Sequence, residues 1–484
     1  MNRWDRMRPY QWRRLQDRKL KEYLQHEVLP YHAFYRERAK ARGINFADIT
    51  SVEKLQQCPE LITQKADIVG HDREFVLQPT FSRMARHDPV KIFGVAIRGM
   101  GRPKTIRRKL RMEYFPVVPT ATTGRSGAQT FFLFTNPDVR GFVGTSARRA
   151  FEMLGIPDEG RGISLFPAAA HLAHVFVVYG AMEVPALVAP LLGLRTEERI
   201  DRIEKSKAAV LFGVPGYVDR VLARAAKQGK DFSSVQCVVV GGAGISEAQR
   251  IRMKEALSVM GSPNAVIVSS YGFTEARIAF IECIEGARKG MDVGYHTYPD
   301  LGIVETVRFT EHEDGSIKTV MPCEELEEGE VLYTPLEGHG SVVLRWRTKD
   351  LARLTHSPCP ACGRSLPRIL GPIRRRSKDM LKNVKATLVD FAEVEIMLDK
   401  DPAVVAWQIV IESRDDNEFL TAYIAFRDDE NTESASVCIR TEFKVETQIS
   451  LDKIVAEPYE TVIKRLGTDT ELKERRIVDL RTEA

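Results

Sequence analysis

The sequence predicts an α/β protein with a large N-terminal domain, residues 1–377, and a small, mobile C-terminal α+β domain, residues 378–484. Three observations support this prediction. Apolar runs alternate with amphipathic helical stretches from residue 161 to residue 270, which is typical of mainly parallel sheets flanked by helices. Short runs of alternating polarity in residues 302–346 indicate an antiparallel β subdomain. After the charged stretch RRRSKDM, residues 374–380, a smaller α+β pattern begins.

Length and composition set the broad class. A chain of 484 residues exceeds what one compact core usually contains, so more than one domain is expected. The composition, 43% apolar and 28% charged, is typical of a soluble globular protein. Lys and Arg exceed Asp and Glu by 71 − 66 = 5, which is too mild a bias to indicate a nucleic-acid partner.

The terminal and apolar segments predict a cytoplasmic protein with no membrane partner. The basic N-terminus lacks the apolar core of a signal peptide. The most apolar window, residues 171–194, contains His171, His174, Glu183 and two prolines, so we interpret it as a buried helix and strand. The seven cysteines are an odd number and do not form a disulfide framework.

The first eighty residues carry apolar side chains at helical spacing and predict helices. Residues 86–112 are predicted to be irregular and basic. Their run KTIRRKLR, residues 104–111, lacks interleaved aromatic side chains, so a solvated surface loop is the favoured interpretation. The functional alternative is a docking patch for an anionic partner, such as a phosphorylated cofactor or a carrier protein.

The predicted strands follow the three patterns in order. The parallel part has ISLFPAA, PALVAPL, AAVLFGVP, VQCVVVGG and AVIVSSYG; the antiparallel part has GIVETVRF, SIKTVMP, GEVLYTPL and SVVLRWR; the C-terminal part has VVAWQIVIES and FLTAYIAF. Ligands of parallel α/β sheets bind at the carboxyl ends of strands, so the loops at those ends are the first candidates for a site.

Three loops end predicted strands with small, polar residues: TATTGRSG (120–127), GGAGIS (241–246) and YGFTEA (271–276). Polar, glycine-containing loops present backbone N–H and hydroxyl donors to phosphate groups. Neither of the first two fits the GxxxxGK[ST] or the GxGxxG pattern, so nucleotide sites of those two types are not supported.

The order of these loops carries more information than any one of them. Followed by RWRTKDL, residues 345–351, they resemble the adenylate-forming superfamily of acyl-CoA ligases, adenylation domains and luciferases. Within it, the segments EGEVLYTPL, CPACGRSLPRILG, SKDMLK and ELKERRIVDLR are similar to those of the phenylacetate–CoA ligase branch. The resemblance covers most of the chain from about residue 115 to residue 481.

The resemblance implies an ATP-dependent, AMP-forming acid–thiol ligase that acts on an aryl or related organic acid. A carboxylate attacks the α-phosphate of MgATP, which gives an acyl-adenylate and pyrophosphate. The thiol of coenzyme A then attacks the acyl carbon, and AMP leaves. The implied cofactors are ATP, Mg²⁺ and coenzyme A. The partners are the acid and coenzyme A or a carrier protein; a homodimer is the one assembly considered, and the sequence does not determine the oligomeric state.

The resemblance also assigns the ATP-binding residues. Hydroxyl and N–H donors of the first loop would bind the β- and γ-phosphates, the second loop and the Tyr271 ring would enclose the adenine, and Asp350 would accept both ribose hydroxyls. The full set is Thr120, Thr122, Thr123, Gly124, Arg125, Gly241, Gly242, Ala243, Tyr271, Gly272, Asp350 and Arg376.

Three further residues take catalytic roles by the same resemblance. Thr274 would donate to phosphate, and Glu275 offers the hard oxygen ligand that Mg²⁺ prefers. Lys473, in the small domain, would reach the carboxylate and the α-phosphate. The acid pocket is expected to include His171, Phe176 and Tyr217, although aromatic residues at such spacing are more often part of a plain core.

A zinc site is predicted around the CPACG knuckle. Cys359 and Cys362 have the CxxC spacing of two ligands of one tetrahedral metal ion. By resemblance, Cys283 and His296 complete a structural, closed Zn²⁺ site, with His356 as the rival fourth ligand. Cys58, Cys237, Cys323 and Cys438 have no partner by spacing and are taken as core or surface residues.

Several positions depart from the family pattern. Ala121 stands at a family glycine, GGAG replaces GGEP, Lys349 replaces the glycine of RTGDL, Lys378 replaces the hinge aspartate, and Leu472 replaces the glycine before the lysine. VKATLVD also lacks a glycine expected beside the pantetheine tunnel. These departures leave two alternatives open: an adenylating enzyme with a carrier-protein thiol or an amine as acceptor, and a catalytically impaired nucleotide-binding relative.

An alternative from another class is a zinc-knuckle protein that binds nucleic acid through KTIRRKLR. The single CxxC, the modest net charge and the lack of interleaved aromatic residues argue against it.

Overall fold

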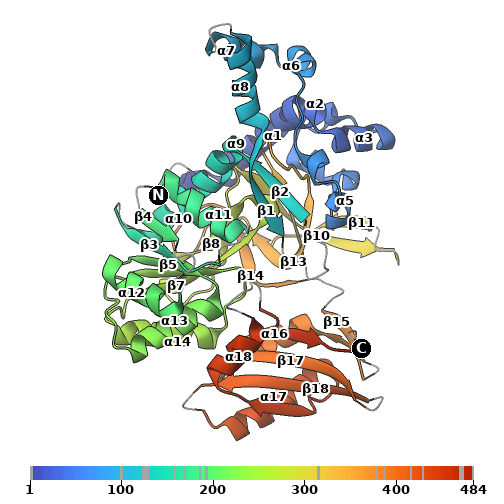
Figure 1. Ribbon diagram of the computed structural model, residues 1–484. Coiled ribbons are helices and arrows are strands. Elements are labelled where there is room, and N and C mark those ends of the chain that lie inside the picture. Colours follow the sequence, from blue (N-terminus) through green and yellow to red (C-terminus); the bar gives the residue numbers. More distant parts are fainter. Residues whose placement is uncertain are drawn as a thin grey trace. The chain divides into compact units, whose positions relative to one another are not determined.

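The computed structural model describes residues 4–98, 102–122, 130–156, 159–167, 171–184, 187–190, 194–312, 317–375, 380–385, 387–414, 417–427, 430–467 and 474–481. The chain divides into two compact units, whose helices and strands are labelled in Figure 1. Unit 1 comprises Met1–Gly155, Ala169–Pro185 and Tyr271–Ile373, and unit 2 comprises Ile156–Ala168, Ala186–Ser270 and Arg374–Ala484.

Unit 1 begins with helices, as the sequence predicts. Pro9 opens the first of them, a position where its missing N–H costs no hydrogen bond, and Gly43, with φ of +68°, ends the third. The helices of unit 1 are α1 (Pro9–Tyr23), α2 (Leu29–Tyr31), α3 (Ala33–Arg42), α4 (Val52–Gln56), α5 (Lys65–Ile68), α6 (Phe81–His87), α7 (Pro89–Arg98), α8 (Pro103–Tyr114), α9 (Asn136–Asp138), α10 (Thr145–Leu154), α11 (Leu172–Gly180) and α15 (Ile284–Arg288).

The N-terminal helices bind a late segment of the chain, residues 338–346. The Tyr23 hydroxyl donates to the Gly338 carbonyl at 2.8 Å, and the Leu344 N–H donates to the Tyr35 hydroxyl at 2.6 Å. His32, whose Nε2 lies 3.1 Å from the Val342 carbonyl oxygen, is separated from it by 310 residues. Burial lowers the pKa of His32 to about 3, so this ring remains neutral.

This pairing explains one error in the predicted strands. The apolar run SVVL, residues 341–344, is not part of a strand, because β13 begins at Trp346. Its backbone bonds to the N-terminal region instead: the Val342 N–H donates to the Phe75 carbonyl at 2.8 Å.

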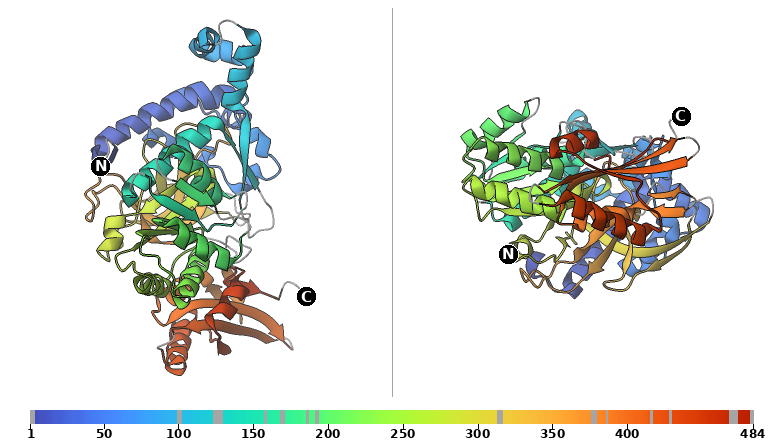
Figure 2. Two further views of the ribbon diagram at one scale, coloured as in Figure 1. Left: turned by 60° about the vertical axis from the view of Figure 1, so that its left-hand side comes forward. Right: turned by 90° about the horizontal axis from the view of Figure 1, so that it is seen from below.

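The expectation that residues 86–112 are irregular is wrong. The structure forms α7 and α8 there, and the run KTIRRKLR lies in α8 rather than in a loop. In two views, α7 and α8, together with the neighbouring α6, stand away from the sheets of unit 1 (Figures 1 and 2).

Two sheets form the rest of unit 1. β1 (Pro116–Thr122) and β2 (Thr130–Thr135) pair as an antiparallel hairpin. The second is part of a 12-stranded sheet, and its strands in unit 1 have the order β11-β10-β12-β13-β14-β9-β8; the predicted antiparallel character of β10, β11 and β12 is confirmed. The strands of this sheet in unit 1 are β8 (Ile278–Glu282), β9 (Tyr295–His296), β10 (Gly302–Glu311), β11 (Ile317–Pro322), β12 (Glu328–Pro335), β13 (Trp346–Thr355) and β14 (Arg368–Arg375).

Unit 2 contains the predicted parallel strands, in the order β7-β6-β5-β3-β4. Continuous apolar runs such as VVV in β6 are buried, as expected for a sheet with covered faces. The elements are β3 (Arg161–Ser164), β4 (Leu187–Pro190), α12 (Thr196–Ser206), β5 (Val210–Gly213), α13 (Pro215–Lys227), β6 (Cys237–Gly241), α14 (Glu247–Val259) and β7 (Val266–Phe273).

The C-terminal residues form their own α+β arrangement. Trp407, Ile409, Leu420 and Phe443 are buried in a core whose members all lie after residue 379. The elements are β15 (Leu381–Val384), β16 (Thr387–Asp390), α16 (Phe391–Lys400), β17 (Val404–Arg414), β18 (Asn417–Phe426), α17 (Thr432–Thr447), β19 (Lys453–Ala456), α18 (Tyr459–Leu466) and β20 (Ile477–Asp479). Within the described residues, each helix is too short or too polar to cross a bilayer.

Candidate active site

The first predicted loop connects the two strands of the β1–β2 hairpin. Residues 123–129, and with them Thr123, Gly124 and Arg125, lie outside the described residues. The Thr120 hydroxyl is buried and donates to the Phe132 carbonyl across the hairpin at 2.8 Å. Thr122 is partly buried, and its hydroxyl lies 3.4 Å from the Thr130 carbonyl oxygen. The first three residues of the predicted loop, Thr120–Thr122, therefore belong to β1, which is a correction to the predicted bounds. The hydroxyl of Thr120 already has a partner in the protein.

Two other predicted segments contact β1. The short 3₁₀ helix η8 (Thr274–Ala276) packs against it and buries Thr274 and Glu275. His171, which precedes α11, places its Nδ1 3.3 Å from the Ala121 carbonyl oxygen. The structure thus gathers Thr122, His171, Thr274 and Glu275 around the loop end of one strand. Phe176 is also in α11 and is buried.

Tyr271 and Asp350 meet although 79 residues separate them. The Tyr271 hydroxyl donates to Asp350 Oδ2 at 2.8 Å. The Tyr271 ring stacks on Phe280 with ring centroids 6.1 Å apart. The Asp350 N–H donates to the Thr348 hydroxyl at 3.0 Å, which orients this segment. One carboxylate oxygen is held by the tyrosine, so the carboxylate has a fixed orientation.

Lys349, beside Asp350, adopts a φ of +61°. This left-handed conformation suits glycine best, and glycine is the residue that the family pattern has at this position. The backbone therefore has the shape of a glycine position although the residue is lysine.

The second predicted loop lies in unit 2, at the carboxyl end of β6. A Cβ on Gly241 would lie 2.3 Å from the Ser270 Oγ of β7, so a larger residue there would displace this hydroxyl, which donates to the Val240 carbonyl at 3.1 Å. Gly242 has a φ of +85°. Ser246 caps α14, since its Oγ accepts from the Gln249 N–H at 3.1 Å and its N–H donates to the Gln249 side chain. Gly241, Gly242 and Ala243 therefore form a tight strand-to-helix turn.

The remaining predicted residues are placed as follows. Tyr217 is packed in the core of unit 2, with the guanidinium groups of Arg199 and Arg220 5.2 and 5.1 Å from its ring centroid. Gly272 lies in β7 between Tyr271 and Phe273. Arg376 and Lys473 lie outside the described residues.

A buried ion pair beside the site was not predicted from the sequence. Arg277 follows η8 and pairs with Asp138 of α9 at 3.3 Å, and both side chains are buried. The same Asp138 carboxylate accepts from the N–H groups of Thr135, His339 and Gly340 at 2.8–3.0 Å. Arg277 also donates to the Ser341 carbonyl.

This network ties η8 to the β2–α9 turn and to the loop at residues 338–341. Burial alone would raise the pKa of Asp138, but Arg277 and the N–H groups lower it below its usual value. Part of this network could have been predicted from the sequence. Thr135 with Asp138 three residues later has the spacing of a capping box at the start of a helix.

The four predicted zinc ligands come together in unit 1. The ligand atoms of Cys283, His296, Cys359 and Cys362 lie within 4.8 Å of one another. Cys359 Sγ is 3.7 Å from Cys283 Sγ, and Cys362 Sγ is 3.4 Å from His296 Nε2. The contact with Cys283 lowers the pKa of the Cys359 thiol. Three sulfurs and one imidazole nitrogen are a donor set that fits a structural Zn²⁺ ion.

The backbone around the knuckle holds this arrangement. The Gly363 N–H donates to the Cys359 carbonyl at 2.8 Å, and Gly363 has a φ of +73°. Lys289 donates to the Ala361 carbonyl at 2.9 Å. The rival ligand His356 is not a member of the cluster and stacks on Trp12, with ring centroids 5.5 Å apart.

The amino-acid sequence is similar to a family of AMP-binding enzymes and to individual phenylacetate–coenzyme A ligases. The AMP-binding enzyme family matches residues 149–322. The chain is 26% identical over 380 residues to the phenylacetate–coenzyme A ligase of Aromatoleum evansii, which covers 75% of this chain and 78% of that protein. It is 27% identical over 300 residues to the phenylacetate–coenzyme A ligase of Thermus thermophilus. This alignment covers 60% of this chain and 61% of that protein.

A solved structure shares the fold over the whole chain. It is a crystal structure of 2-hydroxyisobutyryl-CoA ligase in the postadenylation state, with a TM-score of 0.71 and 14% sequence identity. The match covers 99% of this chain and 91% of that chain.

Proposed function

Because the chain belongs to the adenylate-forming superfamily, in its phenylacetate–coenzyme A ligase branch, we propose that it is an AMP-forming ligase that joins an aryl or related organic acid to coenzyme A. The observation that carries the proposal is the pairing of Tyr271 with Asp350 in the same unit as η8 and the β1 loop. These residues are the ones to which the resemblance assigns the ribose, the adenine and the phosphates.

In the first half-reaction, a carboxylate oxygen of the acid bonds to the α-phosphorus of ATP, and the bond to the bridging oxygen of pyrophosphate breaks. Asp350 would accept the ribose hydroxyls with its fixed carboxylate. Thr122, Thr274 and the loop after Thr122 would donate to phosphate oxygens, where charge must be stabilised. Glu275 would hold Mg²⁺, which neutralises phosphate charge; its buried carboxylate oxygens are hard ligands suited to that ion.

In the second half-reaction, the coenzyme A sulfur bonds to the acyl carbon, AMP leaves, and the thiol proton is lost. The names of the relatives favour coenzyme A over a carrier-protein thiol or an amine as acceptor. We assign Lys473 of the proposed C-terminal domain, residues 378–484, to the adenylation step. The core formed only by residues after 379 supports this proposal, while the compact units group residues 374–484 with residues 156–168 and 186–270.

We place the carboxylic acid near His171, because its ring contacts the strand that leads into the phosphate loop. Phe176, in the helix α11 that follows His171, is apolar and buried, and we propose that it contacts the aryl group of the acid. The packing of Tyr217 in the core of unit 2 favours a structural role for that residue, so it is left out of the proposed pocket.

Pyrophosphate release tests the function. MgATP is incubated with a panel of aromatic and aliphatic acids, each with and without coenzyme A. We expect release that requires an aromatic acid and accelerates with coenzyme A, together with AMP and a thioester product. Lys473→Ala and Glu275→Gln should abolish release with the preferred acid. Release that ignores coenzyme A would indicate another acceptor, and bound ATP without release would indicate an impaired relative.

We also propose that the cysteine and histidine cluster holds one structural Zn²⁺ ion. The donor set is closed, since four protein ligands leave no open position for substrate. Such an ion would join the end of β8, the strand β9 and the knuckle between β13 and β14, and it would stabilise the part of unit 1 that carries Asp350.

Metal analysis of the purified chain is expected to show about one zinc ion per molecule. Cys359→Ser combined with Cys362→Ser should remove the zinc and lower the Tm by several degrees, because the remaining two ligands cannot complete a tetrahedral site. Cys438→Ser, at an exposed position in α17, is the matched control and should change neither quantity. Unchanged zinc content in the double variant would contradict the assignment.

A further inference from the structure

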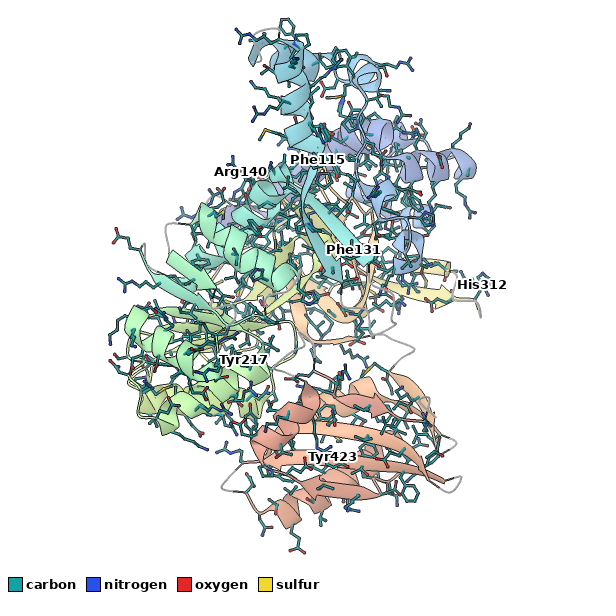
Figure 3. The ribbon with its side chains drawn as sticks, viewed as in Figure 1. Phe115, Phe131, Arg140, Tyr217, His312 and Tyr423 are labelled. Atoms are coloured by element: carbon teal, nitrogen blue, oxygen red, sulfur yellow. The ribbon has the colours of Figure 1, made fainter. Side chains whose placement is uncertain are left out.

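The helical pair α7–α8, residues 89–114, exposes an unusual amount of apolar surface. Val90, Phe93 and Ile97 occupy positions i, i+3 and i+7 of α7 and are 78%, 67% and 62% exposed. This spacing places them on one face of the helix. Other exposed large apolar side chains lie close by in the sequence: Phe81, Met112, Phe115 and Val117. Phe115 lies where α8 meets β1 (Figure 3).

The α7–α8 pair and the residues on either side of it concentrate positive charge. This longer segment, residues 81–117, contains ten Lys and Arg but only Asp88 and Glu113 as acidic residues, a net charge of 10 − 2 = +8. The whole chain carries +5, so the other residues together carry −3. On α8, Lys104, Arg107, Arg108 and Arg111 recur at helical spacing and are all exposed.

The base of the pair is fixed to unit 1 by a network of its own. Lys91 pairs with Glu27 at 3.0 Å and with Glu113 at 2.8 Å. The Tyr114 hydroxyl donates to Glu27 at 2.9 Å, and the Tyr114 ring stacks on His339 with ring centroids 4.4 Å apart. The acidic Glu113 is therefore engaged with Lys91, and the exposed surface further along α8 is dominated by cations.

We propose that the α7–α8 pair docks this protein on the surface of anionic lipid bilayers. Exposed Phe, Ile and Val on one helix of the pair and exposed Lys and Arg on the other supply the two kinds of side chain that interfacial helices use. The apolar side chains would enter the headgroup region, and the cations would contact lipid phosphates and carboxylates. This partner departs from the sequence-based expectation of no membrane contact.

Two other occupants fit the surface less well. A second copy of the chain would bring a +8 segment against another +8 segment, which is repulsive. A nucleic acid would engage the cations but would have no use for the exposed stripe of α7. The observations favour a partner that is both anionic and apolar, as a bilayer surface is.

Vesicle sedimentation with the full-length protein tests the proposal. We expect binding to phosphatidylcholine vesicles that contain phosphatidylserine and none to phosphatidylcholine alone. Arg107→Gln with Arg108→Gln should weaken the partitioning roughly 30-fold, since each cation near such a surface contributes about a factor of five. Phe93→Ser with Ile97→Ser should weaken it at least about tenfold through the loss of apolar burial.

Matched controls separate the α7–α8 surface from general changes. Arg14→Gln with Arg18→Gln removes two exposed cations from α1, and Val437→Ser with Val445→Ser removes two exposed apolar side chains from α17. Both controls should partition like the wild type. Equal binding of all variants, or no binding of the wild type, would overturn the proposal. A second outcome would also overturn it: the wild type binds an acidic protein or duplex DNA but no vesicles, and only the variant Arg107→Gln with Arg108→Gln loses that binding.

Discussion

Replacing Asp350 with alanine is expected to lower kcat/KM for ATP by roughly 10²- to 10⁴-fold. In the proposed complex, both ribose hydroxyls donate to this carboxylate, and each such hydrogen bond to a charged acceptor would contribute about 1.5–3 kcal/mol. The Tyr271 hydroxyl holds one oxygen of this carboxylate, so Tyr271→Phe, which keeps the ring that stacks on Phe280, should cost only about tenfold. Steady-state kinetics with saturating acid and coenzyme A measures both effects.

Two comparisons make this prediction specific to the ribose. Deoxygenated ATP analogues, lacking either the 2′- or the 3′-hydroxyl, should be poor substrates for the wild type but no worse than ATP for Asp350→Ala. The loss caused by Tyr271→Phe should largely disappear in the Asp350→Ala background, because the tyrosine acts through the carboxylate. If the Asp350 variant still discriminates against both analogues as the wild type does, Asp350 does not bind the ribose.

Arg277→Met is expected to lower the free energy of unfolding by about 3–5 kcal/mol, because it leaves the buried Asp138 carboxylate without its cation. The three N–H groups that bind Asp138 remain, so the protein should still fold at low temperature. Chemical denaturation at neutral pH measures the change. Arg288→Met, which removes an exposed pair with Glu285, is the matched control and should cost at most about 0.5 kcal/mol.

The same pair predicts a dependence on pH with a defined sign. Because the folded pKa of Asp138 is lowered, its stabilising contribution is present above the unfolded value of about 4 and is lost as the pH falls through the folded pKa. The stability difference between wild type and Arg277→Met should therefore be largest near neutral pH and shrink below about pH 4. A difference that stays constant into acid would show that the ion pair does not contribute through this carboxylate.

The parallel strands could be predicted because each one is marked by its own local sequence pattern. Runs such as VVV in β6 and VIV in β7 are continuous, β-branched and bounded by glycine or polar residues, and their burial on both faces leaves little alternative. The clustering of Cys283, His296, Cys359 and Cys362 was also predicted, since the CxxC spacing fixes two of these residues locally and the resemblance supplied the other two. The sequence could not predict whether Thr120 and Tyr217 line a site, because a threonine or a tyrosine packs in a core equally well.

Other features depend on contacts that no local pattern records. SVVL has the composition of a strand, yet its partners are N-terminal residues such as Tyr35 and Phe75. Arg277 and Asp138 meet across 139 residues, without a spacing motif. For α7, the i, i+3, i+7 spacing of Val90, Phe93 and Ile97 was a helical signal, but the basic residues around it favoured an irregular interpretation.

During synthesis, the N-terminal helices emerge long before residues 338–346, the segment to which they bind. His32 and its acceptor Val342 are 310 residues apart, so a ribosome adding about 5–20 residues per second needs roughly 15–60 seconds between them. During that interval Tyr35, Phe75 and their apolar neighbours are on a nascent chain without the segment that covers them. We therefore expect translation products that end before residue 338 to expose this apolar surface and to be less soluble than the full-length chain.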